Sequence, residues 1–90
     1  MSVTRRLTII NEKGLHARAS AKFVEQVESH DARAQVEKDG ETASGDSIMG
    51  LLMLAAAKGS TITLTATGPE AEKLADALAA LVADYFGEGM

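Results

Sequence analysis

His16 lies at the junction between an alternating run that ends at Ile10 and a helical run that begins near Ala17. A side chain at a helix start faces backbone N–H groups and the positive end of the helix dipole, which together favour anions. Arg18 adds a guanidinium suited to bidentate contact with oxyanions. A nucleophile, an anion pocket and a counter-charge thus fall within three residues, His16 to Arg18, which predicts a phosphoryl-carrying site.

A plain surface or capping histidine is the commoner role at a helix start, and the local pattern by itself leaves that alternative open. Three features of the residues around His16 strengthen the phosphoryl-carrying interpretation against it. Gly14 supplies an unusual backbone conformation for the turn from strand to helix. Leu15 is apolar in a polar loop, so we expect it to anchor the loop and fix the ring. The neutral imidazole that must attack is common at neutral pH, because an unperturbed histidine has a pKa near 6.5. The dipole that disfavours imidazolium also favours the attached phosphoryl group.

Ser47 directly precedes a short apolar run that is predicted to form a helix, and two roles are possible for its hydroxyl group. As a helix N-cap it typically stabilises by ~1 kcal/mol. As a phosphorylation site it would place a charge of about −1.5 to −2 at a helix start, which the dipole tolerates. That charge would lie beside Ile48, Met49, Leu52 and Met53. One short helix can hardly bury all the apolar residues of this run, so we expect part of their surface to be exposed: Ile48, Met49, Leu51, Leu52, Met53 and Leu54.

The second histidine, His30, lies in a polar connection without neighbouring glycine or cationic support, so we interpret it as structural. Together with His16 it still lacks convincing metal ligands, because the chain has no cysteine and its carboxylates are scattered. We therefore expect neither a metal nor a cofactor.

The composition is that of one globular domain spanning residues 1–90. A net charge of −4 and 3% aromatic residues argue against a nucleic-acid partner. We see neither a signal peptide nor a membrane-inserting segment. The absence of cysteine fits a reducing compartment, and we expect a cytoplasmic protein.

Alternating residues predict four strands, over residues 3–10, 33–37, 41–43 and 61–67. Asp39-Gly40 is a strong signal for a hairpin between the middle two. Helical spacing predicts a helix that begins near Ala17 and ends between Glu28 and His30, a short one after a cap at Asp46 or Ser47, and a third from about Glu70. The expected apolar stripe of the first helix is Ala17, Ala21, Val24 and Val27, flanked by Phe23. That of the third is Ala71, Leu74, Ala75, Leu78, Leu81, Val82 and Tyr85, with Gly87 as its stop.

The order βαββαβα, with a largely Thr/Arg outer face, predicts an α+β open-faced β-sandwich. In it a four-stranded antiparallel sheet carries three helices on one face.

Two motifs resemble those of a known family. Gly14-Leu15-His16-Ala17-Arg18 and Ser47-Ile48-Met49-Gly50 are similar to the two signatures of HPr, the histidine-containing phosphocarrier of the phosphoenolpyruvate phosphotransferase system. The resemblance extends over nearly the whole chain, including the order of elements and the separation of the motifs. It is therefore more specific than either motif alone.

The resemblance implies a cytoplasmic relay protein and not an enzyme. His16 would accept phosphoryl at Nδ1 from phospho-enzyme I and pass it to an enzyme IIA component. Arg18 would steady the group, and the backbone N–H groups of Ala17 and Arg18 would cradle it. Ser47 would be the regulatory serine of an HPr kinase/phosphorylase. The partner-docking residues would be Ile48, Met49, Leu52 and Met53. A relay that releases each partner is best served by a monomer with modest interfaces.

Ala19 departs from the family pattern, which usually has proline there to rigidify the first helical turn. With Ser20 it is more similar to the nitrogen-related phosphocarriers, a regulatory branch acting on non-transport partners. The Ser47 motif instead implies a kinase-regulated system.

Two other classes of function remain as alternatives to a relay. One is an interaction module whose His16 region only binds an anion. The other is an enzyme with His16 as general base, although no partner acid, deep pocket, phosphate loop or dinucleotide motif is evident.

Overall fold

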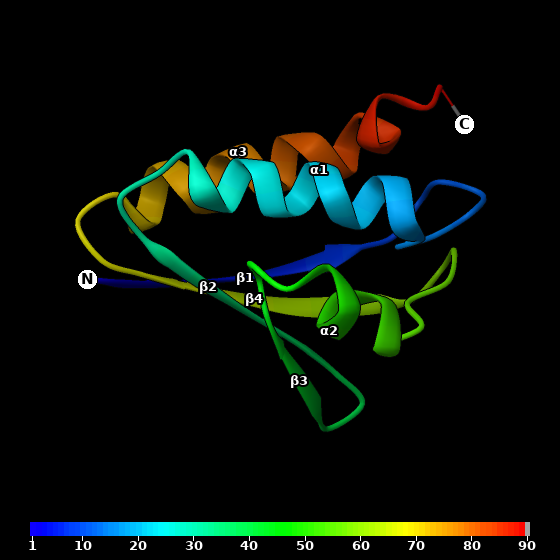
Figure 1. The fold of residues 1–90 in the computed structure, drawn as a ribbon, viewed down its shortest axis with the longest axis horizontal. Coiled ribbons are helices and arrows are strands. Elements are labelled where there is room, and N and C mark those ends of the chain that lie inside the picture. Colours follow the sequence, from blue (N-terminus) through cyan, green and yellow to red (C-terminus); the bar gives the residue numbers. More distant parts are fainter. Residues whose placement is uncertain (90) are drawn as a thin grey trace.

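The computed structural model describes residues 1–89. Within them the strands and helices follow the predicted order, and a 3-10 turn is added after the last helix (Figure 1). The elements are β1 (Ser2–Thr8), α1 (Ala17–Glu28), β2 (Arg33–Lys38), β3 (Glu41–Ser44), α2 (Ile48–Met53), β4 (Thr61–Thr67), α3 (Ala71–Ala83) and η1 (Tyr85–Gly87).

The strands form one antiparallel sheet in the order β1-β4-β2-β3. The β2–β3 hairpin turns at Asp39 and Gly40, which have φ values of 52° and 85°. Positive φ at both positions matches the right-handed twist of the flanking strands and confirms the predicted turn. The first and last strands in sequence are neighbours, with Leu7 opposite Ile62. This pairing leaves the loop that follows β1 next to the segment that precedes β4.

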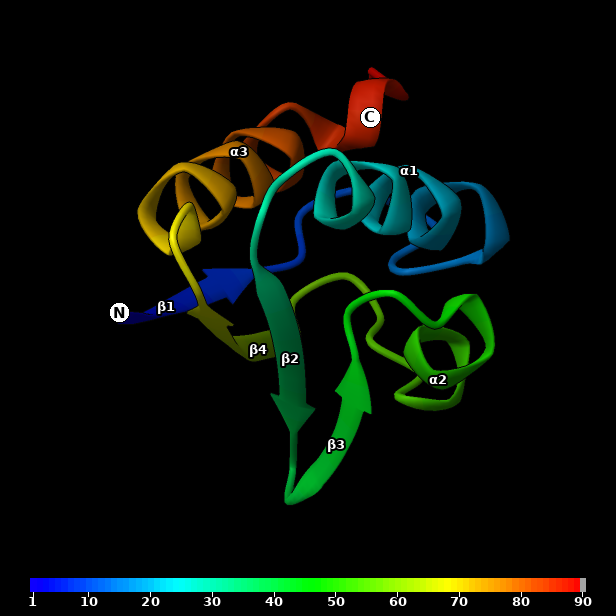
Figure 2. The ribbon, with the colours of Figure 1, turned by 60° about the vertical axis from the view of Figure 1, so that its left-hand side comes forward.

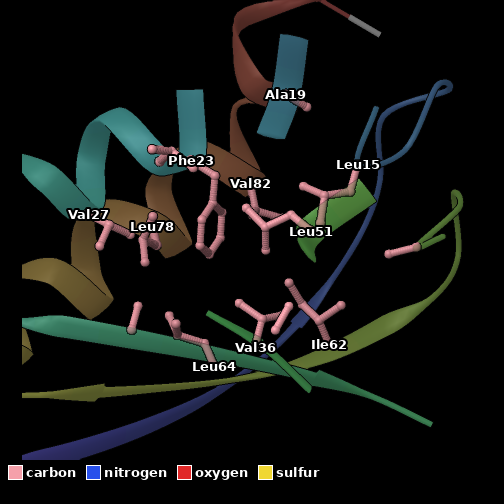
Figure 3. Packing of buried hydrophobic residues seen from close by; sticks show 14 of the residues in the cluster. Leu15, Ala19, Phe23, Val27, Val36, Leu51, Ile62, Leu64, Leu78 and Val82 are labelled. Carbon is pink, nitrogen blue, oxygen red and sulfur yellow. The ribbon is translucent and has the colours of Figure 1, made fainter. Parts of the chain in front are cut away.

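The helices cover one face of the sheet, as predicted (Figure 2). α1 and α3 pack against each other, and α2 packs against α1 and β3. Phe23 of α1 and Leu78 of α3 are fully buried and lie above Val36 and Leu64 of the sheet (Figure 3). The threonine and arginine side chains of the opposite face are exposed or half-buried, so the alternation in the sequence is the alternation of the two sheet faces.

Two details of the predicted helices are wrong. In α1 the buried alanine is Ala19, whereas Ala17 is exposed, so the apolar stripe is shifted toward Phe23. α3 ends at Ala83 and not beyond Tyr85. Tyr85 is 38% exposed, and the next aromatic residue, Phe86, is fully buried in its place. A change of backbone conformation at these two residues, which both have positive φ, turns Phe86 inward.

Candidate functional site

The loop between β1 and α1 is held at both ends by backbone hydrogen bonds to the segment before β4. The N–H of Gly59 donates to the carbonyl of Ile9 at 2.7 Å, and the N–H of Leu15 donates to the carbonyl of Ala56 at 2.9 Å. Leu15 is only 3% exposed, which confirms that it anchors the loop. The residue after it, His16, is therefore fixed relative to the sheet.

Gly14 allows this close approach. Its φ is +64°, and an added Cβ would lie 2.9 Å from Cα of Ala57 and closer still to the carbonyl oxygen of Ala56. No other residue fits both the left-handed conformation and the available space. The glycine of the predicted motif is thus required by the packing of two backbone segments.

Asn11 fixes the inside of the same loop. Its side chain is fully buried, and Nδ2 donates to the carbonyl of Gly14 at 2.8 Å. The backbone adds a bond from the N–H of Gly14 to the carbonyl of Asn11 at 3.1 Å. The four residues before Leu15 therefore form a small closed turn.

His16 is the N-cap residue of α1, as its position in the sequence predicts. Its carbonyl accepts from the N–H of Ser20 at 2.8 Å, whereas its imidazole makes no capping hydrogen bond. Within residues 1–89 the backbone N–H groups of Ala17 and Arg18 have no acceptor. The side chain of His16 is 26% exposed. The ring thus stands beside donors that are free to bind an anion.

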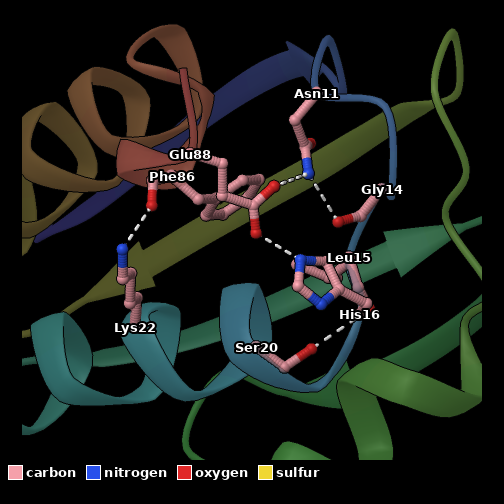
Figure 4. Close-up of polar contacts among 8 residues, drawn as sticks. All are labelled: Asn11, Gly14, Leu15, His16, Ser20, Lys22, Phe86 and Glu88. Atoms are coloured by element: carbon pink, nitrogen blue, oxygen red, sulfur yellow. Dashed lines mark hydrogen bonds and ion pairs between the residues drawn. The ribbon is translucent and has the colours of Figure 1, made fainter. Parts of the chain in front are cut away.

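The other side of the imidazole is covered by Glu88, which follows η1. Nε2 of His16 pairs with Oε2 of Glu88, and Nδ2 of Asn11 donates to Oε1 of the same carboxylate at 3.0 Å (Figure 4). The Glu88 side chain is only 12% exposed. The second ring nitrogen, Nδ1, points away from Glu88 and has no hydrogen-bond partner among residues 1–89.

The surroundings of Glu88 favour its charged form. Burial by itself raises the pKa of Glu88, but hydrogen bonds from Asn11 and His16 and the positive charges of His16 and Lys13 outweigh it. The pKa therefore lies below the ordinary value of 4.5. At neutral pH the group facing Nε2 is a carboxylate, which can only accept a hydrogen bond.

Arg18 lies on the first turn of α1 and is exposed. Within the part of the chain that the structure describes, its guanidinium forms no hydrogen bond or ion pair. It is thus available to an incoming anion. His30, in contrast, is at the far end of α1, where Nδ1 lies 2.7 Å from the carbonyl oxygen of Gln26. That contact agrees with a structural role.

Ser47 is the N-cap of α2, and its hydroxyl accepts from the N–H of Gly50 at 3.0 Å. The cap is therefore Ser47 and not Asp46. Gly50 is tightly enclosed, since an added Cβ would lie 3.1 Å from Oγ of Ser47 and 3.2 Å from Cβ of Ala43. The first turn of α2, which Ser47 caps, therefore packs closely against Ala43 of β3 in the β2–β3 hairpin.

The apolar residues after Ser47 divide into two groups. Leu51 and Leu54 point into the core and are 0% and 5% exposed. Ile48, Met49 and Met53 are 40%, 68% and 77% exposed, and Leu52 is half-buried. The sequence argument that one short helix cannot bury all of them is confirmed. The exposed set of Ile48, Met49, Leu52 and Met53 is called the α2 patch below.

Sequence reasoning missed two residues of the site, Asn11 and Glu88. The sequence provides only a weak indication of Asn11, which is a polar residue at the start of the loop that leads to His16. Its importance becomes evident from its complete burial in the structure. Glu88 carried none, because it lies 72 residues from His16 in the sequence. The sequence also predicts no partner acid for His16, and the contact between His16 and Glu88 corrects that expectation.

Among residues 1–89 no group of three or more histidine, cysteine, aspartate or glutamate side chains is placed to hold a metal ion. In the same part of the chain no helix has the length and apolar character needed to cross a membrane.

Comparison with known proteins supplies the family. The family model described as "PTS HPr component phosphorylation site" matches residues 3–84. Phosphocarrier protein HPr of Cupriavidus necator is 47% identical over 85 residues, covering 94% of this chain and 96% of that protein. Phosphocarrier protein NPr of Shewanella violacea is 42% identical over 84 residues, covering 93% and 92%. The crystal structure of HPr from Bacillus anthracis superposes with a TM-score of 0.86 at 42% identity, covering 90% of this chain and 96% of that one. This chain belongs to the HPr family of phosphocarrier proteins of the phosphotransferase system.

Proposed function

We propose that this protein is a stoichiometric phosphoryl relay. Nδ1 of His16 accepts the phosphoryl group from phospho-enzyme I, which is charged by phosphoenolpyruvate, and delivers it to an enzyme IIA component. The protein turns over no substrate of its own and works only with these partners, as a monomer in the cytoplasm.

The observation that carries this proposal is the state of the His16 ring. One nitrogen, Nε2, is occupied by Glu88, and the other has no partner among residues 1–89. The ring is partly exposed, so a partner protein can reach it. A neutral imidazole with one nitrogen hydrogen-bonded and the other free is suited to nucleophilic attack on phosphorus.

The start of α1 supplies the charge stabilisation. The free N–H groups of Ala17 and Arg18 point toward the space before the helix, where phosphoryl oxygens attached to Nδ1 would lie. The exposed guanidinium of Arg18 adds a mobile positive charge. Backbone donors thus provide fixed contacts, and Arg18 adapts to the group as it arrives and leaves.

Ser47 and the α2 patch form the regulatory half of the proposal. The α2 patch is an exposed apolar surface of the kind that binds partners transiently, and α2 packs directly against α1, which carries the site. Phosphorylation of Ser47 by an HPr kinase/phosphorylase would add charge at the edge of this patch and hinder docking. The same surface then decides when His16 can be loaded.

The test is incubation with labelled phosphoenolpyruvate and enzyme I. Wild-type protein should gain an acid-labile, hydroxide-stable label, and His16→Ala should gain none. The matched control is His30→Ala, which removes the other histidine and should be labelled like wild type. A wild type that stays unlabelled beside a competent enzyme I contradicts the relay and leaves the anion-binding module.

A second candidate function is the nitrogen-related branch, in which the same phosphorylated site regulates non-transport partners. Ala19 favours it, because alanine stands where the family usually has proline and, with Ser20, resembles the pattern of the nitrogen-related members. Comparison of transfer from the two kinds of enzyme I, sugar-linked and nitrogen-linked, separates the branches: the cognate donor should load His16 faster.

A further inference from the structure

We infer that Glu88 is a positioning residue for phosphoryl transfer: its carboxylate keeps the hydrogen of the His16 ring on Nε2 and balances the positive charge of the phosphorylated ring. This inference rests on the proposed function, because it concerns the same ring. It assigns a role to the C-terminal end of the chain, outside both sequence motifs.

Glu88 reaches the His16 ring through a turn in which two residues have an unfavourable backbone conformation. Tyr85 and Phe86 have φ values of 56° and 53°. Both values lie in the left-handed region of backbone conformation, which residues other than glycine rarely adopt. Two contacts hold the turn: Phe86 is fully buried, and Nζ of Lys22 donates to its carbonyl oxygen at 2.6 Å. Backbone strain maintained by surrounding contacts is typical of functional sites.

The first consequence concerns the tautomer of His16. A carboxylate only accepts hydrogen bonds, so the ring nitrogen that faces it must carry the hydrogen. In a neutral imidazole the other nitrogen, Nδ1, then holds the lone pair. Glu88 therefore keeps the ring in the one neutral form in which Nδ1 can attack.

The second consequence concerns charge during transfer. The lone pair of Nδ1 forms the N–P bond while the bond from phosphorus to the donor atom breaks, and that bonding pair leaves with the donor. The ring now holds phosphorus on Nδ1 and hydrogen on Nε2 and carries a positive charge, which the Glu88 carboxylate stabilises. When the phosphoryl group moves on, the bonding pair returns to Nδ1. The Nε2 proton stays in place throughout.

Asn11 makes the carboxylate difficult to replace. Its Nδ2 donates both to Gly14 and to Oε1 of Glu88, so this side of the group at position 88 must be an acceptor. In Glu88→Gln the amide oxygen is therefore expected to face Asn11, which turns the NH₂ group toward Nε2. A donor at that place favours the opposite tautomer, with hydrogen on Nδ1.

The experiment compares wild type, Glu88→Gln and the control Glu12→Gln. The control removes the same charge from an exposed residue of the His16 loop. The ¹⁵N chemical shifts of the unphosphorylated His16 ring, at a pH where the ring is neutral, report which nitrogen carries hydrogen. Wild type and Glu12→Gln should have hydrogen on Nε2, and Glu88→Gln should shift toward hydrogen on Nδ1.

The kinetic arm measures phosphoryl acceptance from enzyme I. Glu88→Gln should slow it about tenfold or more, as expected for loss of a charge-assisted hydrogen bond, with Glu12→Gln near wild type. The same tautomer in wild type and Glu88→Gln overturns the inference, as does a shifted tautomer with an unchanged rate. If wild type accepts no phosphoryl group at all, the proposed function fails, and the NMR measurement still decides whether Glu88 sets the tautomer.

Discussion

The ammonium group of Lys22 donates a hydrogen bond to the carbonyl oxygen of Phe86 at 2.6 Å and thereby ties the middle of α1 to the turn after α3. This bond joins residues 64 positions apart in the sequence. Because α1 begins at the His16 cap, one helix holds the reactive ring at its start and, through Lys22, the segment that covers the ring.

Replacing Lys22 with methionine should loosen the C-terminal segment while leaving α1 intact, because methionine is a good helix former of similar length. We expect a loss of about 1.5–3 kcal/mol in the free energy of unfolding, the usual contribution of a hydrogen bond made by a charged group. Amide hydrogen exchange at residues 86–88 should accelerate. Exposed Lys58 provides the control, since Lys58→Met should change neither quantity. Unchanged exchange in Lys22→Met would show that burial of Phe86 alone holds the turn.

Gly14→Ala should destabilise the protein for two separable reasons. The left-handed conformation costs a residue with a side chain roughly 1–2 kcal/mol. The added methyl group would also contact Ala56 and Ala57. Gly59→Ala is the matched control, because Gly59 has a φ of +92° and nothing within 4 Å of an added Cβ. In denaturant unfolding Gly14→Ala should therefore lose clearly more than Gly59→Ala. Equal losses would mean that the neighbouring backbone yields without cost.

Substitutions of Ser47 can separate its capping role from its regulatory role. Aspartate and asparagine cap helices about as well as serine, whereas alanine costs ~1 kcal/mol. Ser47→Asp and Ser47→Asn should therefore unfold like wild type, and Ser47→Ala should be less stable. Only Ser47→Asp adds a charge beside the α2 patch, so it alone should slow transfer from enzyme I. Equal slowing in Ser47→Asn would point to shape and not to charge.

The Glu88 carboxylate should make stability depend on acid pH. Hydrogen bonds from Asn11 and His16 and the charges of His16 and Lys13 lower the pKa of Glu88 in the folded protein against the opposing effect of burial. A lowered folded-state pKa means that the stabilisation is fully present above the ordinary pKa of 4.5 and is lost as the pH falls through the folded-state value. The difference in unfolding free energy between wild type and Glu88→Gln should accordingly shrink as the pH falls below 4.5 toward the folded-state value. A difference that grows as the pH falls below 4.5 would contradict the sign of this pKa shift.

Local features of the sequence determined most of the fold. The alternation of Ile62, Leu64 and Ala66 with threonines defines β4 because a strand places successive side chains on opposite faces of the sheet. Asp39-Gly40 defines the hairpin because its turn needs positive φ, and Ser47 defines the start of α2 because its hydroxyl accepts a backbone hydrogen bond. Each of these signals involves residues that are close together in the chain.

The position of His16 at a helix start was such a local signal, and the sequence by itself predicted it. Its partner was decided only by the tertiary structure. Glu88 reaches the ring because α3 packs beside α1 and because the chain turns at Phe86, which depends on a buried aromatic ring and on Lys22. No periodicity encodes that turn, since its positive φ values are unfavourable locally and are stabilised by contacts made across the whole domain. The sequence therefore identified the ring, and the packing of the two helices decided which of its nitrogens is left free.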